Sequence, residues 1–172
     1  MAGGARITVT EAGRADRVAL VPLLAEMGRH YGERTDTATL GAAAEALTSP
    51  AGRAGPFCLL ARRQGVAVGL ASLSGVFPAR DFTWGLYLKD LYVIEAARGA
   101  GIGRALMAEA MRFAALQGYT RVDWTTEAGN APARTFYAGL GVAPAGRILY
   151  RLAEEELAAA AQGRWPAERS VR

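Results

Sequence analysis

The spacing of apolar and polar positions along the first third of the chain predicts one strand followed by two helices. Residues 5–11 alternate apolar and polar side chains, which is typical of a half-buried strand. Over residues 15–32 the apolar positions recur at helical spacing, and Pro22 inside this pattern predicts a kink or a later helix start. A second helix is predicted over residues 37–47. It is expected to end there because Ser49 precedes a proline, and a residue before proline disfavours helical backbone.

The middle of the chain predicts a sheet that one helix interrupts. Residues 57–62 and 66–76 are apolar runs separated by a short turn, which predicts a hairpin. A long strand is predicted over residues 84–94, followed by a helix over residues 101–118. Residues 120–126 predict the next strand, and we expect it to run parallel to the previous one because a helix connects them.

The C-terminal part of the chain predicts shorter elements. Two strands are expected around residues 142–144 and 147–152, and acidic residues followed by strong helix formers predict a helix over residues 154–162. The tail from Gly163 onward is polar apart from Trp165, which we interpret as a hint of a homodimer contact.

Composition narrows the class of protein. A chain of 172 residues, about half of them apolar, can bury one substantial core. We therefore expect a single domain over residues 1–172, with a core at about 5–152 and a C-terminal helix and tail at 153–172. No apolar run is long enough to cross a bilayer and no signal peptide is recognisable, which predicts a cytoplasmic protein without a membrane partner. Cys58 lies in an apolar run and is expected to be buried.

Charge and metal-binding residues exclude further classes. The net charge of +4 comes from arginines scattered along the chain, without aromatic residues interleaved among them, so we expect no nucleic-acid partner. One His and one Cys do not make a metal cluster, so we expect no metal.

The segment from Asp90 to Arg104 joins a strand, a turn and a helix N-terminus. The first backbone N–H groups of a helix lack partners within it and carry the positive end of its dipole, so a phosphate binds there. Gly99, Gly101 and Gly103 keep side chains away from that backbone, and Arg98 and Arg104 add positive charge. The segment therefore predicts an anion site.

The glycine segment has three other interpretations. A Walker loop needs Lys and then Ser or Thr after its last glycine, whereas Arg104 and Ala105 follow Gly103. A dinucleotide fingerprint lacks its third glycine here, although Asp123 lies at a suitable distance for a ribose contact, and too few residues follow for a doubly wound sheet. The glycines could also serve only a tight turn between strand and helix.

The run 98–103 (Arg-Gly-Ala-Gly-Ile-Gly) resembles the Q/R-x-x-G-x-G/A signature of the GCN5-related N-acetyltransferases (GNAT superfamily). Residues 130–142 resemble the Asn-x-x-Ala-x-x-x-Tyr helix that follows it in this family. The resemblance covers about residues 85–145. It implies an α/β GNAT fold, a mixed and mostly antiparallel sheet of six to seven strands flanked by helices, with a splayed parallel strand pair at the coenzyme site. It also implies acetyl-CoA as co-substrate and transfer of acetyl to a primary amine of a small molecule or a peptide.

The resemblance also implies roles for individual residues. The pantetheine arm would run along the first strand of the splayed pair, and the glycine segment would hold the pyrophosphate. The implied coenzyme contacts are Leu91, Tyr92, Val93, Arg98, Gly99, Ala100, Gly101, Ile102, Gly103, Arg104 and Asn130. The Val93 N–H would stabilise the oxyanion, and Tyr137 would be the general acid, since phenol and thiol pKa values are comparable.

The general base and the acceptor contacts are less defined. Asp90, Tyr87 and Glu127 are candidates for the base, as is a chain of water molecules. The loop after the first helix commonly forms one wall of the acceptor site in the family, which implies His30, Tyr31, Glu33 and Asp36 as contacts, although polar residues also suit a solvated helix end. Further candidate contacts are Trp84, Lys89 and Glu127.

The segment 86–93 resembles most closely the diamine and polyamine acetyltransferase branch. That branch usually carries Glu-Asp where this chain has Lys89 and Asp90, and a lysine there would repel a cationic polyamine. Two alternatives remain open at this point: a coenzyme A-binding sensor without turnover, and a protein lysine or N-terminal acetyltransferase.

Overall fold

The computed structural model describes residues 6–165, which fall into two units, one ending at Asn130 and one beginning at Ala131. Each unit is described by itself. The expectation of a single domain over residues 1–172 stays a prediction. The end of the predicted tail, residues 166–172, and the first residue of the predicted strand 5–11 lie outside the described residues.

The first unit is built on a five-stranded sheet whose strands lie side by side in chain order. The strands are β1 (Ile7–Glu11), β2 (Phe57–Arg63), β3 (Val66–Val76), β4 (Gly85–Val93) and β5 (Val122–Trp124). The pairs β1–β2, β2–β3 and β3–β4 are antiparallel, and β4–β5 is parallel. This confirms the mixed, mostly antiparallel sheet and its parallel pair.

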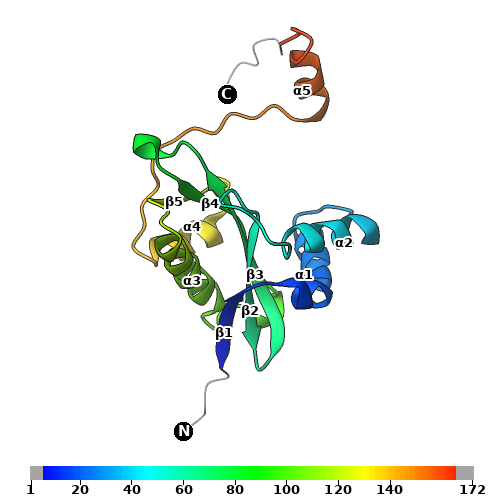
Figure 1. The fold of residues 1–172 in the computed structure, drawn as a ribbon, viewed down its shortest axis with the longest axis vertical. Coiled ribbons are helices and arrows are strands. Elements are labelled where there is room, and N and C mark those ends of the chain that lie inside the picture. The colour runs from blue at the N-terminus through cyan, green and yellow to red at the C-terminus, as the bar shows by residue number, and fades with distance from the viewer. Residues whose placement is uncertain (1–5, 166–172) are drawn as a thin grey trace. The chain divides into compact units, whose positions relative to one another are not determined.

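Helices cover both faces of this sheet (Figure 1). The α-helices of the unit are α1 (Arg17–His30), α2 (Thr37–Ala46) and α3 (Ile102–Leu116), and the 3-10 turns are η1 (Arg14–Asp16), η2 (Arg80–Phe82) and η3 (Glu95–Ala97). On one face, Leu20 and Leu24 of α1 belong to the same buried cluster as Cys58, Leu70 and Tyr92. On the other face, α3 buries the predicted core positions Ile102, Leu106, Ala110 and Phe113.

Of two further expectations about this unit, one is wrong in part and one is confirmed. Helix α1 begins at Arg17 and runs through Pro22, so the alternative of a later helix start is wrong. A proline at this place removes the N–H that would reach back to Val18, and Val18 is 86% exposed, so water can solvate the vacated carbonyl. The predicted burial of Cys58 is confirmed, since the residue is fully buried.

The second unit contains two short helices, α4 (Ala131–Ala138) and α5 (Glu154–Ala160). Within the described residues, the segment between them has no strand, so the strands predicted at 142–144 and 147–152 are wrong and the sheet has five strands rather than six or seven. Ile148, Leu149 and Tyr150 are exposed, which means that their β-prone side chains lack the sheet partner that a strand needs.

The described part of the chain contains neither a helix that could span a membrane nor a cluster of metal-binding side chains. None of its helices combines the length and the apolar character that crossing a membrane requires. Residues 6–165 also contain no group of three or more His, Cys, Asp or Glu side chains placed to hold a metal ion.

Candidate functional site

Strand β4 has a free edge along its second half. Its parallel partner β5 pairs only with residues 86–88, whereas β4 continues to Val93. On the other side, β3 pairs with β4 as far as Val93. Within residues 6–130, therefore, β4 carries strand-like backbone beyond Leu88 that no strand pairs on the β5 side.

A β-bulge in β4 decides which backbone groups face this open side. The register with β3 shifts between Ser72 and Leu73, so that Leu88 and Lys89 together lie opposite one residue of β3. Before the bulge, the Leu86 N–H donates to the Arg121 carbonyl on the β5 side at 2.9 Å.

Beyond the bulge the alternation has changed phase. The Ile94 N–H donates to the Val68 carbonyl at 3.0 Å, which directs it toward β3. Because backbone groups alternate along a strand, Tyr92 also faces β3, whereas Leu91 and Val93 direct their N–H and C=O groups to the open side. Of the three β4 residues expected to contact the coenzyme, two thus offer backbone hydrogen bonds there.

Helix α3 begins directly beyond this edge. Gly99 and Gly101 have φ values of +77° and +83°, a conformation that side chains with a Cβ rarely adopt. Gly101 is the N-cap of α3, and its carbonyl accepts the Ala105 N–H at 3.0 Å. The N–H groups of the first helical turn, from Ile102 onward, therefore begin at a glycine that leaves them accessible to an anion.

Arg98 links the glycine segment to the open edge. Its Nε–H donates to the Val93 carbonyl at 3.0 Å, and its guanidinium lies 5.9 Å from the centre of the Tyr92 ring. The Arg98 side chain therefore places a positive charge against the end of β4, three residues before the N-cap of α3. Backbone donors, a helix dipole and a cation in one place suit the pyrophosphate and amide groups of coenzyme A.

A group of polar side chains adjoins the bulge from the α1 side of the sheet. Lys89 Nζ lies 3.6 Å from Asp90 Oδ1, and 69% of the Lys89 side chain is exposed. Burial raises the pKa of Tyr31, the Asp90 carboxylate raises it further, and Lys89 and Arg98 oppose this rise. The structure thus brings the predicted acceptor contact Tyr31 and the predicted base Asp90 together.

The Asp90 carboxylate has a partner that the sequence interpretation missed. Ser72 Oγ donates to Asp90 Oδ2 at 2.6 Å, from the neighbouring strand β3. Ser72 is buried, and it is the one polar side chain in the apolar run 70–73. That interruption was the available signal, because a buried hydroxyl needs a hydrogen-bond partner.

Tyr92 joins α1 to the same region. Its hydroxyl donates to Glu26 Oε1 at 3.0 Å, and its ring centre lies 5.8 Å from that of His30. Burial raises the pKa of Tyr92, and the hydrogen bond to Glu26 raises it further. The Tyr92 side chain therefore fixes the end of α1 against β4 and belongs to the framework of the site.

Other predicted residues lie elsewhere in the structure. Trp84 precedes β4 at the end away from the bulge, where it contacts the Phe77 ring at 5.3 Å and the Arg53 guanidinium at 5.8 Å. Glu127 lies in the exposed loop after β5, where its carbonyl accepts the Asn130 N–H at 2.9 Å. The acceptor roles of both residues stay predictions.

Tyr137 lies on α4, in the second unit, and its ring meets that of Phe136 edge to face at 5.2 Å. Asn130 is the last residue of the first unit and immediately precedes α4. The predicted roles of Tyr137 as acid and of Asn130 as a coenzyme contact stay predictions.

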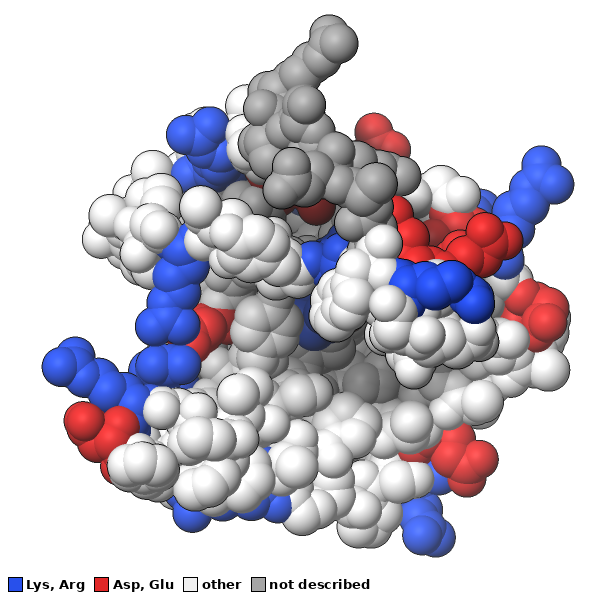
Figure 2. All heavy atoms as spheres, turned by 90° about the horizontal axis from the view of Figure 1, so that it is seen from above, with Lys and Arg blue, Asp and Glu red and all other residues white. Residues whose placement is uncertain are grey.

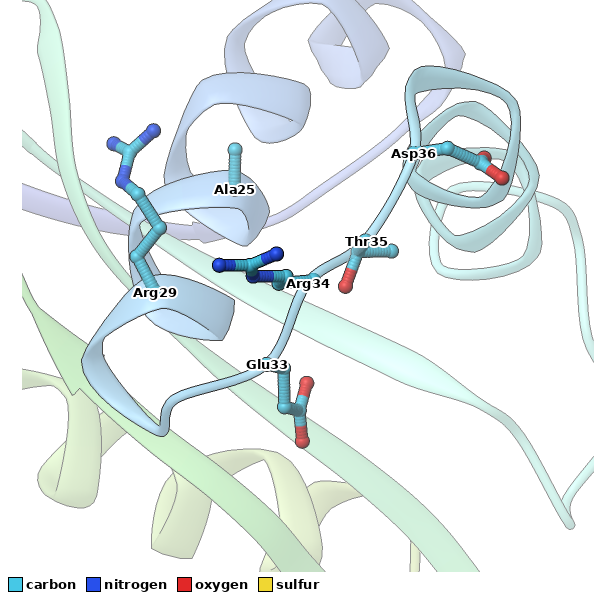
Figure 3. Close-up of a pocket in the computed structure, with 6 residues that line it drawn as sticks. All are labelled: Ala25, Arg29, Glu33, Arg34, Thr35 and Asp36. Atoms are coloured by element: carbon cyan, nitrogen blue, oxygen red, sulfur yellow. The ribbon is translucent and has the colours of Figure 1, made fainter.

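An open hollow of about 480 Å³ lies beside the C-terminal half of α1 (Figure 3). It is lined by Ala25, Arg29, Glu33, Arg34, Thr35 and Asp36. Asp36 is partly committed to structure, because its Oδ1 accepts the Thr39 N–H at 2.7 Å at the start of α2. The predicted contacts Glu33 and Asp36 therefore line a hollow at the connection between α1 and α2.

Charge is mixed over the face of the molecule that Figure 2 shows. On the face shown in Figure 2, Lys and Arg side chains alternate with Asp and Glu side chains and with uncharged areas. Several arginines are engaged within the chain, as in the ion pairs Arg17–Glu45 and Arg112–Glu109. On this face the charged side chains are therefore mixed in sign rather than gathered into one positive patch.

The comparisons with known proteins agree with this geometry. Residues 24–142 match the model of the acetyltransferase (GNAT) family. None of the curated proteins compared with the chain matches it.

Several solved structures share the fold. An integron cassette protein from the mobile metagenome of V. cholerae is 26% identical, with a TM-score of 0.77, and the match covers 91% of this chain and 98% of that one. The aminoglycoside N-acetyltransferase AAC(6')-Iy, solved in complex with CoA, is 15% identical, with a TM-score of 0.73 and coverage of 89% and 98%. A ribosomal-protein-alanine N-acetyltransferase from Brucella melitensis biovar Abortus 2308 is 21% identical, with a TM-score of 0.73 and coverage of 87% and 99%.

The family match spans more than half of the chain and includes both the free edge of β4 and the N-terminus of α3. This chain therefore belongs to the acetyltransferase (GNAT) family.

Proposed function

We propose that this chain is an acetyl-CoA-dependent N-acetyltransferase that transfers acetyl directly to a primary amine of a small molecule or a peptide. The observation that carries the proposal is the free edge of β4, which leads from the bulge at Lys89 to the N-terminus of α3. An extended ligand with amide groups at one end and a pyrophosphate at the other fits backbone donors along a strand followed by a helix N-terminus.

The coenzyme would be held by backbone groups and one arginine. Leu91 and Val93 would hydrogen-bond the pantetheine amides, and the first N–H groups of α3 would bind the pyrophosphate. Arg98, already hydrogen-bonded to the Val93 carbonyl, would add charge beside the phosphates. Bound acetyl-CoA would supply a thioester that an uncharged amine can attack.

The side chains have distinct parts in the reaction. With the pyrophosphate at α3, the thioester would lie nearer Leu91 than Val93, so the oxyanion donor would be the Leu91 N–H rather than the Val93 N–H that the resemblance implies. Asp90, held by Ser72, would accept a proton from the incoming ammonium group, and Tyr137 would protonate the departing thiolate. Tyr31 and Glu33 would contact the acceptor, with Lys89 at its edge.

The class of amine is the open part of the proposal. The structural neighbours include an aminoglycoside acetyltransferase and a ribosomal-protein-alanine acetyltransferase, which names both a small-molecule and a protein acceptor. The diamine and polyamine branch has no support from these comparisons, and the exposed Lys89 ammonium would repel a polycation.

The test combines binding with turnover. Thermal unfolding is measured with and without acetyl-CoA, and thiol release is then followed against a panel of amines. At a hundredfold excess over its dissociation constant, a ligand of the folded state adds about 2.7 kcal/mol to the free energy of unfolding, so a clear rise in Tm is expected. No shift in Tm would overturn the coenzyme assignment.

Variants separate an enzyme from a sensor. Tyr137→Phe is expected to lower kcat by roughly a hundredfold or more while leaving the Tm shift in place, since general acids contribute about that much. Tyr150→Phe, a matched loss of one hydroxyl from an exposed tyrosine, should behave like the wild type. A Tm shift without turnover of any amine would instead favour a coenzyme A-binding sensor.

A further inference from the structure

Lys89 is the only lysine in the sequence, in which every other basic residue apart from His30 is an arginine. The residue does not lie at an arbitrary surface position, because it is the extra residue of the β4 bulge. Its side chain is 69% exposed, so the Lys89 amine is open to solvent.

Lys89 lies at one end of the free edge of β4. The edge begins at the N-terminus of α3, where the pyrophosphate is proposed to bind, and ends at the bulge. A coenzyme lying along Val93 and Leu91 would therefore direct its acyl end toward Lys89.

The neighbouring groups suit a reaction of the Lys89 amine. An ammonium group must lose a proton before it can attack, and Asp90 Oδ1 lies 3.6 Å from Lys89 Nζ. An arginine could not replace it, because a guanidinium does not lose its proton in proteins.

We propose that Lys89 is a self-acetylation site, at which the chain transfers acetyl from its own bound acetyl-CoA to the Lys89 side chain. This inference rests on the proposed function and extends it to a covalent modification of the acceptor side. The Lys89 nitrogen, after giving one proton to Asp90 or water, forms a bond to the acetyl carbon. The bond from carbon to sulfur breaks, the second proton leaves the nitrogen, and coenzyme A departs as the thiol.

Acetylation would change the charge of the acceptor side. An acetylated Lys89 has no positive charge, so its ion pair with Asp90 is lost and the positive charge beside the Asp90 carboxylate falls by one. A cationic acceptor would then be repelled less than by the unmodified chain.

The experiment incubates the full chain with acetyl-CoA and locates acetyl groups by peptide mass spectrometry. The expected result is acetylation of Lys89 approaching one group per chain, at a rate that does not change on dilution of the protein, because the transfer is within one chain. Lys89→Arg keeps the charge and is expected to lose this modification. An excess of free coenzyme A, which competes for the site, is expected to suppress it in the wild type.

The other outcomes overturn the proposal in distinguishable ways. If the wild type acetylates an added amine while Lys89 stays unmodified, the self-acetylation site is refuted and the proposed function stands. Acetylation of Lys89 that excess coenzyme A leaves unchanged is reaction from solution, which also refutes the site. If acetyl-CoA neither raises Tm nor acetylates any amine, the proposed function fails together with this inference.

Discussion

The Arg98 side chain donates a hydrogen bond to the carbonyl oxygen of Val93 at 3.0 Å and thereby spans the turn between β4 and α3. Arg98 lies five positions after Val93 along the chain, and the turn η3 lies between the two residues. One side chain thus connects the edge proposed for pantetheine with the helix terminus proposed for phosphate.

Replacing Arg98 should weaken coenzyme binding more than folding. Arg98 is exposed, so the Arg98→Ala variant should have nearly the free energy of unfolding of the wild type. The dissociation constant of this variant for acetyl-CoA should be roughly tenfold higher than that of the wild type, equivalent to about 1.4 kcal/mol. Isothermal titration calorimetry measures this change. Arg98→Lys keeps the charge without the planar group, so its affinity for acetyl-CoA should lie between those of the wild type and Arg98→Ala. Wild-type affinity in Arg98→Ala would exclude a role of Arg98 in coenzyme binding.

Gly101 should tolerate no side chain. Because its φ is +83°, Gly101→Ala should cost about 1–2 kcal/mol of backbone strain or move the first turn of α3 away from the ligand. Either response should reduce the Tm shift that acetyl-CoA produces. Gly41→Ala is the matched control, because Gly41 lies inside α2 with open space around it. This substitution should raise the free energy of unfolding by about 0.5–1 kcal/mol. Equal effects at the two positions would contradict this account.

Ser72 should act through Asp90. Ser72→Ala leaves Asp90 Oδ2 without its donor at 2.6 Å and should lower the free energy of unfolding by about 1 kcal/mol. If Asp90 is the proposed base, kcat should fall in Ser72→Ala while KM for acetyl-CoA stays constant, and Ser72→Thr should restore part of kcat. Steady-state kinetics with both substrates varied separates these effects. Unchanged kcat in Ser72→Ala would restrict the pair to a structural role.

Cys58 should be unreactive in the folded chain. Burial raises the pKa of its thiol from 9.0 to about 12, and the Asp16 carboxylate contributes to the rise. Thiol reagents should therefore label Cys58 only on unfolding, so the residue will not disturb assays of coenzyme A release. Labelling of the native chain at neutral pH would contradict its burial.

The same shift predicts a loss of stability in alkaline solution. Below pH 9 the Cys58 thiol is protonated in both states and contributes nothing to the pH dependence. Between about pH 9 and 12 the unfolded chain releases this proton and the folded chain keeps it, so the free energy of unfolding falls as pH rises. In Cys58→Ala the free energy of unfolding should therefore fall less between these pH values than in the wild type. Urea unfolding across the range measures this difference. A smaller fall should remain in the variant, because the pKa values of Tyr31, Tyr92 and Tyr119 are also raised in the folded chain.

Elements with a strong local signal were predicted well. Helix α3 combines a glycine start with apolar residues at helical spacing, and its four predicted core positions are all buried. The antiparallel strands and the parallel pair follow from alternation and from the helical connection. The strands expected at 142–144 and 147–152 failed because a strand depends on a distant partner, which neither Ile148 nor Tyr150 specifies in its own sequence.

The candidate site was predictable where it consists of backbone and less so where it consists of side chains. The strand that contains Leu91 to Val93 and the glycine turn before α3 could be predicted as elements, because glycine and strand patterns are local. Their coenzyme contacts came from the family resemblance and stay predictions. The Ser72 partner of Asp90 could not, since their pairing depends on the register between β3 and β4. That register contains a shift at the bulge, and no residue type in the sequence predicts it.

The bulge in β4 also bears on how such chains diverge. The strand pairs with β3 as if it were one residue shorter, because Leu88 and Lys89 share a single place opposite Leu73. Lys89 is in effect a one-residue insertion, and a relative with a flat strand here would align with a gap at this position and no change in the buried pattern. Because the side chain of residue 89 is exposed, substitutions there can change the charge beside Asp90 without changing the buried side chains of β4.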